Sequence, residues 1–66
     1  MLYKDALKLK EGDKVTQKAN GYIITVEHIE TYRSMRNFVE YVTIVGTTEN
    51  GCRMRHNHKE VNKYKE

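Results

Sequence analysis

The stretch that decides the fold is residues 20–32, which read NGYIITVEHIETY. The Asn20-Gly21 pair that opens it is the preferred centre of a type I′ β-hairpin turn, because both central residues of that turn need a positive φ. The run that follows is rich in β-branched and aromatic residues, which favour a strand. Tyr22, Ile24 and Val26 alternate along this strand and so share one face. We therefore expect a hairpin at this turn and an all-β fold around it.

The same stretch predicts a bend in the strand. Ile29 has the opposite parity to Val26, so on a regular strand its side chain would face away from the core. A β-bulge near Glu27-His28 would return Ile29 to the core side and add the sharp bend that a small barrel needs. We expect one long, bent strand over residues 22–32.

Two further strands follow. Residues 33–37 are polar at both ends and lack periodicity, which predicts a basic loop. Residues 38–47 carry apolar side chains on both parities, typical of a strand covered on both faces, so we place this strand at the centre of the sheet. A second Asn-Gly pair, at residues 50–51, predicts a hairpin into a fourth strand. Alternate residues of that strand should face opposite sides of the sheet. The inner face would carry Cys52, Met54 and His56, and the basic outer face would carry Arg53, Arg55 and Asn57.

The two ends of the chain complete the pattern. Residues 1–10 predict a short helix or turn, and residues 13–18 predict a first strand after a turn at residues 11–13. Residues 58–60 predict a 3₁₀ turn, and residues 61–64 predict a brief closing strand. The inward residues expected at the N-terminal end are Leu2, Ala6, Leu9 and Val15.

Length and composition indicate one small domain. The 66 residues, of which 32% are charged, contain no linker and no biased segment, so we expect a single small β-barrel domain over residues 1–66. No apolar run is long enough to cross a bilayer, so we expect no membrane partner. Cys52 is the only cysteine, which excludes an intramolecular disulfide and favours a reducing, cytoplasmic location.

The order of these signals resembles a known family. It runs from LKEGDKV at residues 9–15 through Asn20-Gly21, YIITV at residues 22–26 and Asn50-Gly51 to Glu60-Val61. This order is similar to that of small Src-homology-3-like barrels, including the KOW-like ones. The resemblance implies a five-stranded open barrel with a short N-terminal helix or turn. It also implies non-catalytic roles such as nucleic-acid binding or assembly into larger complexes. The chain has no Trp and no acidic specificity loop, in which it departs from the peptide-binding members.

Catalytic and metal chemistry find little support in the residues. Cys52, Met54, His56 and His58 fall at every second position, but alternate strand residues stand roughly 6.6 Å apart, so four in a row do not reach one ion. One Cys with scattered His residues is a weak constellation for a nucleophile. All four glycines are interpreted as turn or strand-end residues. We expect no metal, no cofactor and no enzymatic activity.

The remaining signal is basic and aromatic. The net charge of +3 mildly favours anionic partners. In a meander the loop and the fourth strand bring cations beside exposed aromatic rings, which suits phosphates and stacked bases. We therefore expect a binding module that contacts nucleic acid or another phosphorylated ligand. The residues expected at this face are Arg33, Arg36, Arg53, Arg55, Tyr32 and Tyr41.

Two alternatives stay open at this point. The basic residues are also consistent with a solvated face whose charge is partly neutralised by Glu27, Glu30, Glu40 and Glu49. The chain is also consistent with a small interaction or regulatory protein, of phage or mobile-element type. Such a protein would use an exposed strand edge, or a Tyr and Met surface, on a protein partner or a second copy of itself.

Overall fold

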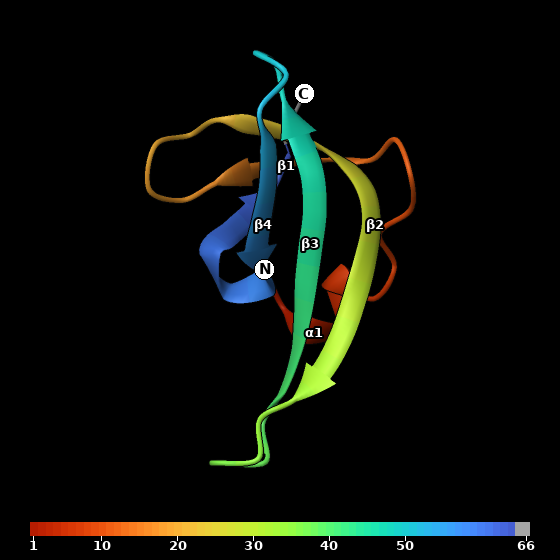
Figure 1. Ribbon diagram of the computed structural model, residues 1–66, viewed down its shortest axis with the longest axis vertical. Coiled ribbons are helices and arrows are strands. Elements are labelled where there is room, and N and C mark those ends of the chain that lie inside the picture. The colour runs from red at the N-terminus through yellow and green to blue at the C-terminus, as the bar shows by residue number, and fades with distance from the viewer. Residues whose placement is uncertain (65–66) are drawn as a thin grey trace.

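The structure is a computed structural model, and it describes residues 1–64. A short helix precedes five strands that form one antiparallel sheet in the order β4-β3-β2-β1-β5 (Figure 1). A 3₁₀ turn joins the last two strands. The bounds are α1 (Tyr3–Ala6), β1 (Lys14–Gln17), β2 (Ile23–Arg33), β3 (Glu40–Thr48), β4 (Arg53–Asn57), η1 (His58–Glu60) and β5 (Val61–Lys63).

This arrangement confirms the all-β prediction with a short N-terminal helix, and it gives the sheet two edges. The last strand, β5, pairs with β1 and not with β4. The sheet is therefore not a closed barrel. The third strand was expected at the centre of the sheet; β3 does lie between β2 and β4, but the middle strand of the five is β2.

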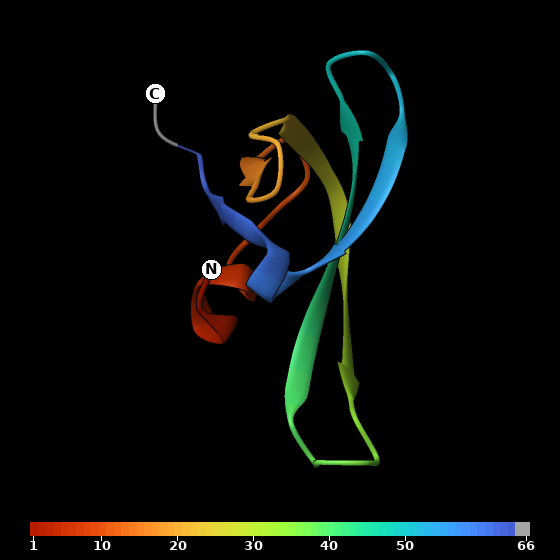
Figure 2. The same cartoon turned by 90° about the vertical axis from the view of Figure 1, so that its left-hand side faces the viewer.

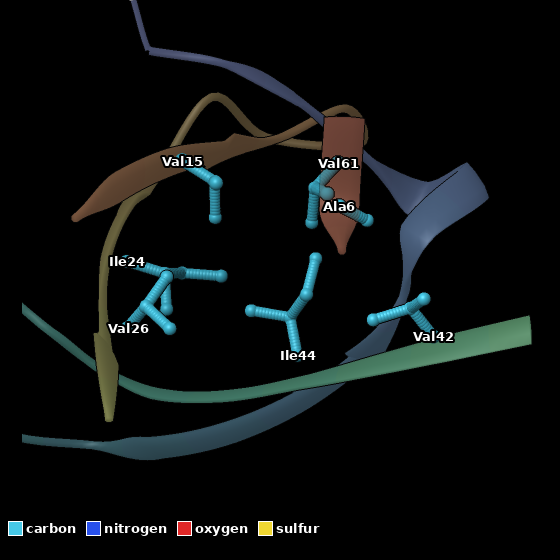
Figure 3. Close-up of a cluster of buried hydrophobic side chains, with 7 residues drawn as sticks. All are labelled: Ala6, Val15, Ile24, Val26, Val42, Ile44 and Val61. Carbon is cyan, nitrogen blue, oxygen red and sulfur yellow. The ribbon is translucent and has the colours of Figure 1, made fainter. Parts of the chain in front are cut away.

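The core lies on the concave side of the sheet and is built from small aliphatic side chains. Strands β1, β2, β3 and β5 and helix α1 all contribute to it (Figure 3). Its largest fully buried residues are Ile and Val, and the partly buried Tyr3, Ile29 and Met54 pack against it. Residues in the fully buried cluster are Ala6, Val15, Ile24, Val26, Val42, Ile44 and Val61.

The bend in β2 is the feature that shapes the molecule. The register between β2 and β3 shifts between Val26 and His28, so the predicted bulge is confirmed. After the shift Ile29 pairs with Ile44 on the core side. The part of β2 before the bulge pairs with β1, whereas the part after it continues with β3 alone, as a long hairpin whose far end projects beyond the core (Figure 2). We call this hairpin, residues 28–45, the arm.

The two Asn-Gly turns differ from the predicted type. Gly21 has φ +73° but Asn20 does not have a positive φ, so the first turn is not type I′. The chain instead makes a wider loop in which the Gly21 N–H donates to the Gln17 carbonyl at 2.7 Å. At the second turn Gly51 has φ +86° and its N–H donates to the Thr48 carbonyl at 2.9 Å. That geometry still joins β3 to β4 as a hairpin.

Several residues expected at the ends of elements lie elsewhere. Tyr22 was expected on the inner face of β2, but it precedes the strand and is 55% exposed. Leu2 was expected to face the barrel and is exposed, because the helix covers only one turn and Met1 and Tyr3 pack inward in its place. Cys52, expected on the inner face of β4, lies before that strand and is exposed.

The interpretation of Gly46 was also wrong. It does not lie at a turn or a strand end, because β3 continues from Glu40 to Thr48 on either side of it. Gly46 is buried where β2 passes closely over β3, opposite Val26. A Cβ there would collide with the carbonyl oxygen of Thr25. A requirement for space, not for backbone freedom, explains this glycine.

Candidate functional site

The expected basic and aromatic residues lie along the arm and β4, but on two different faces. Tyr32 pairs with Tyr41 across β2 and β3, and their rings stack with centroids 5.3 Å apart. Arg53 and Arg55 lie on the same outer face of the sheet, because they pair with Thr47 and Val45 of β3. Arg33 alternates with Tyr32 and therefore points to the opposite face. The structure thus brings together part of the expected set.

Most of the expected cations are neutralised. Arg53 contacts Glu27 at 3.3 Å and Arg55 contacts Glu30 at 2.6 Å, both reaching from β4 across β3 to β2. Arg33 contacts Glu40 at 2.6 Å on the other face. Among the residues that the structure describes, Arg36 is the one arginine of the four without an ion pair.

The outer ion pairs form a cover over an apolar residue. Val45 lies on the outer face, outside the core cluster, yet it is only 1% exposed. In the strand register Val45 pairs with His28 of β2 and with Arg55 of β4. The ion pair between Arg55 and Glu30 joins β4 to β2 and so spans β3 near Val45. The hydrogen bond from His28, followed by the charge of Arg55, lowers the pKa of Glu30. The outer face is therefore a charged but balanced layer packed on β3.

A second network ties the arm, just below its tip, to helix α1. The hydrogen bond from Arg33, and then that from Tyr3, lower the pKa of Glu40. The pKa of the Tyr3 hydroxyl is raised by desolvation first and by the Glu40 hydrogen bond second. These contacts hold the end of the strand pair, next to the tip, against the N-terminal segment.

A buried histidine fixes the β3 edge of the arm. His58 is 4% exposed, and its Nδ1 accepts a hydrogen bond from the Val42 N–H at 3.2 Å, where β4 has ended. The Tyr3 and Tyr41 rings lie 5.8 and 6.0 Å from the His58 ring. Desolvation and then the nearby Lys59 charge lower the pKa of His58. The ring is therefore a neutral structural acceptor, a role that its sequence position did not reveal.

The tip of the arm carries the least expected feature. Met35 is 83% exposed and Phe38 is 72% exposed, and Val39 beside them is exposed as well. Phe38 and Val39 were expected in the third strand, but the strand begins only at Glu40. Phe38 instead takes the left-handed conformation, with φ +58°. It is the only non-glycine residue with positive φ among residues 1–64.

Local hydrogen bonds hold the tip in this conformation. The Phe38 N–H donates to the Ser34 carbonyl at 2.8 Å, and the Ser34 N–H donates to the Val39 carbonyl at 2.9 Å. The Asn37 side chain accepts from the Val39 N–H at 3.0 Å. The Ser34 hydroxyl accepts from the Arg36 N–H at 3.3 Å. The apolar side chains are thus presented outward on an ordered loop.

The excess positive charge lies elsewhere, beside helix α1. An open cavity of about 550 Å³ is lined by Lys8, Lys14 and Lys63 together with Asp5 and Asp13. The Lys14 ammonium lies 5.7 Å from the centre of the Tyr64 ring. Sequence periodicity gave no sign of this cluster, because its lysines come from three separate segments. It is a mixed surface with a modest surplus of cations.

The remaining histidine and cysteine residues do not converge. Met54 packs against the core, Cys52 is exposed, and His56 lies 3.3 Å from Glu60. Over residues 1–64, no three His, Cys, Asp or Glu side chains gather in a way that would hold a metal ion.

Comparison with protein-family models, with curated proteins and with solved structures finds no match to this chain. No helix within residues 1–64 is long and apolar enough to span a membrane. Functional inference for this protein therefore depends on its own residues, above all on the arm and its tip.

Proposed function

We propose that this protein is a non-enzymatic binding module, built as a Src-homology-3-like open barrel, whose arm docks on a protein partner. The observation that carries the proposal is the placement of Phe38. It is the only phenylalanine in a chain that has no tryptophan, and it stands in solvent at the tip of the arm. A domain of this size has little apolar surface to spare from its core.

The conformation of Phe38 supports the same function. A left-handed backbone costs a residue with a Cβ roughly 1–2 kcal/mol, which Gly would avoid and Asn would reduce. Strained residues of this kind gather at ligand-contact sites, where the surrounding structure over-determines them. An ordered, exposed aromatic ring, with the exposed Met35 in the same loop, is the type of anchor that fills a pocket at a protein interface.

The charge distribution favours a protein over a polyanion as partner of the arm. Phosphate binding requires cations that are free to replace counterions. Three of the four arginines near the arm are already paired with Glu27, Glu30 and Glu40. The apolar tip with Arg36 next to it suits an apolar pocket with an acidic rim. We include a reducing, cytoplasmic location in the proposal, because the thiol of Cys52 is free and exposed.

The test compares proteins captured from source-cell extract on immobilised wild-type chain and on variants. The tip variant is Met35→Ser with Phe38→Asn, and the matched control is Tyr22→Ser, which removes an exposed aromatic ring remote from the tip. We expect one partner to be retained by the wild type and by the control and lost from the tip variant. A photo-crosslinking phenylalanine analogue at position 38 should join the same partner covalently. Equal retention by the tip variant would contradict the proposal.

Nucleic acid or another phosphorylated ligand is the second candidate. The observations in its favour are the stacked Tyr32 and Tyr41, Arg36 in the loop that follows β2, which has no ion pair within residues 1–64, and the lysine surplus beside α1. Fluorescence polarisation with short RNA and single-stranded DNA at about 50 and 200 mM salt tests it, since phosphate contacts weaken steeply over this range. Salt-sensitive binding that is lost in Arg36→Gln or in Lys14→Gln would move the function to this candidate. Absence of binding at both salts would leave the protein partner.

A further inference from the structure

The outer edge of β2 is left without a partner strand along the arm. β1 pairs with β2 only over Ile23 to Thr25, and the last backbone hydrogen bonds on that side join Val26 to Gly12 and Asp13. Beyond the bulge, β2 continues to Arg33 with β3 as its one neighbour among the described residues (Figure 1). This segment, residues 28–33, is called the free edge below.

The hydrogen-bond pattern identifies which groups point outward. The Ser34 N–H donates to the carbonyl of Val39, which directly precedes β3, so in the antiparallel ladder Tyr32, Glu30 and His28 also face β3. The alternate residues Ile29, Thr31 and Arg33 therefore direct their N–H and C=O groups to the free edge. Across residues 1–64, no backbone or side-chain hydrogen bond reaches the N–H groups of these three residues from that side. The opposite edge of the arm, by contrast, is occupied at Val42 by His58.

Such an edge is a template for another strand, because its donors and acceptors stand in a row at strand spacing. We propose that the free edge pairs with the free edge of a second copy of this chain. The two β2 strands would run antiparallel about a two-fold axis at Thr31, joining the two sheets into one. Ile29 of each copy then faces Arg33 of the other, and Thr31 faces Thr31.

Charge and register select this pairing. With the axis at Thr31, each of the three outward residues in each copy donates one N–H, so six hydrogen bonds form. Moving the axis to Glu30 would set the two Glu30 carboxylates directly opposite one another, which is destabilising. Moving it to Tyr32 would keep only four of the bonds within the free edge. The chosen register places Glu30 opposite Tyr32, so no like charges face each other.

The other edges of the sheet are less suited to self-pairing. On β4, an axis at Arg55 or at Met54 would bring arginines of the two copies face to face, because Arg53 and Arg55 alternate there. The edge strand β5 has only three residues, Val61–Lys63. Self-pairing at β2 is separate from the function of the tip, since the axis at Thr31 leaves Phe38 outside the paired segment. The dimer would present its two tips in opposite directions, which would give two-site binding to a repeated partner.

The test is sedimentation velocity of the intact chain over about 1 μM to 1 mM, together with amide exchange measured by NMR at both ends of that range. We expect the mass to rise from 7.8 kDa toward twice that value with concentration. Exchange at Ile29, Thr31 and Arg33 should slow in step, whereas exchange at Glu30 and Tyr32, which already bond to β3, should not change. A mass that stays at 7.8 kDa throughout would overturn the proposal.

A proline substitution isolates the edge from the fold. Thr31→Pro removes an outward N–H that the β2–β3 ladder does not use, and proline is tolerated at such edge positions. It should weaken dimerisation at least about tenfold. Arg53→Pro, which blocks the outward N–H at the start of the β4 edge, is the matched control and should leave the dimer intact. Dimerisation lost equally in both variants, or exchange that slows at every amide, would overturn the proposed register. Neither result depends on the tip variant, so the two proposals fail separately.

Discussion

Gly46 offers the sharpest test of how β2 and β3 pack. Its position on the inner face of β3 is flanked by Val26 of β2 and Met54 of β4. A Cβ built there would meet the Thr25 carbonyl oxygen within contact distance and would lie 2.7 Å from Cγ2 of Ile24. Both neighbours are held firmly, the first because it is backbone and the second because Ile24 is fully buried. The Gly46→Ala variant must therefore separate the two strands locally.

The expected cost follows from that geometry. Overpacking a core by one methyl group costs about 1–3 kcal/mol, and the rigid neighbours place Gly46→Ala near the upper end. The smaller entropy of Ala in the unfolded chain returns about 0.5–1 kcal/mol. A net loss of about 2 kcal/mol is a large share of the roughly 3–10 kcal/mol expected for a domain of this size. It corresponds to a fall in Tm of roughly 10–15 °C.

Urea denaturation followed by circular dichroism measures this loss. The matched control is Gly51→Ala. Gly51 has a positive φ of +86°, which disfavours Ala, but a methyl group added there would have no atom within 4 Å. That control should cost roughly 1 kcal/mol through backbone strain alone. If Gly46→Ala lost no more stability than Gly51→Ala, the close approach of β2 to β3 at this point would be refuted.

Three further predictions concern the arm. Phe38→Asn should raise the free energy of unfolding by about 0.5–1 kcal/mol, because Asn tolerates φ +58°. Phe38→Ala should give no such gain, and equal stability of the two variants in urea denaturation would contradict backbone strain at this position. His58 has a folded pKa below its ordinary 6.5, so its stabilisation is complete above pH 6.5 and is lost as the pH falls from there through the folded pKa, at no more than about 1.4 kcal/mol per pH unit. Unfolding measured from pH 8 to 5 should therefore show a slope that flattens in His58→Asn, whose Oδ1 can still accept from Val42, and an unchanged slope would count against the neutral acceptor. Glu30 and Glu40 have pKa values below their ordinary 4.5, so their stabilisation is present above pH 4.5 and is lost on further acidification, a loss that Glu30→Gln with Glu40→Gln should abolish.

The bend in β2 could be predicted from sequence because it leaves a trace in parity. Val26 and Ile29 both need the core, and only an extra residue between them allows this on one strand. The 3₁₀ turn at η1 and the hairpin at Asn50-Gly51 were likewise predictable from local chemistry and are present. Each of these features depends on residues that are neighbours in the chain.

The tip and the ion pairs could not be predicted in this way. Phe38 and Val39 have the composition of a strand, but they belong to the loop that closes the hairpin, where Phe38 takes a positive φ. The pairing of Arg53 with Glu27 and of Arg55 with Glu30 depends on the registers of three strands at once, including the bulge. A shift of one residue in either ladder would have left these arginines free. The sequence could therefore predict which residue types gather on this face. It could not predict the net charge of the face, because the ion pairs that neutralise it depend on the strand register.

The same bulge explains why this small protein has an arm at all. By adding one residue between Val26 and His28, it turns β2 away from β1, so the second half of the strand continues with only β3 beside it and its far end extends beyond the core. A hairpin that leaves its sheet gains no stability from burial at its tip, and it keeps one row of backbone groups exposed along its edge. The chain nevertheless supports the arm below its tip, with Glu40 held by Arg33 and Tyr3 on one face and the Val42 N–H capped by His58 at one edge. Support below the tip combined with exposure at the tip is expected of an element whose contacts are completed by another molecule. Loss of partner binding in a tip variant that unfolds at higher urea concentration than the wild type would separate this explanation from a role of the arm in folding.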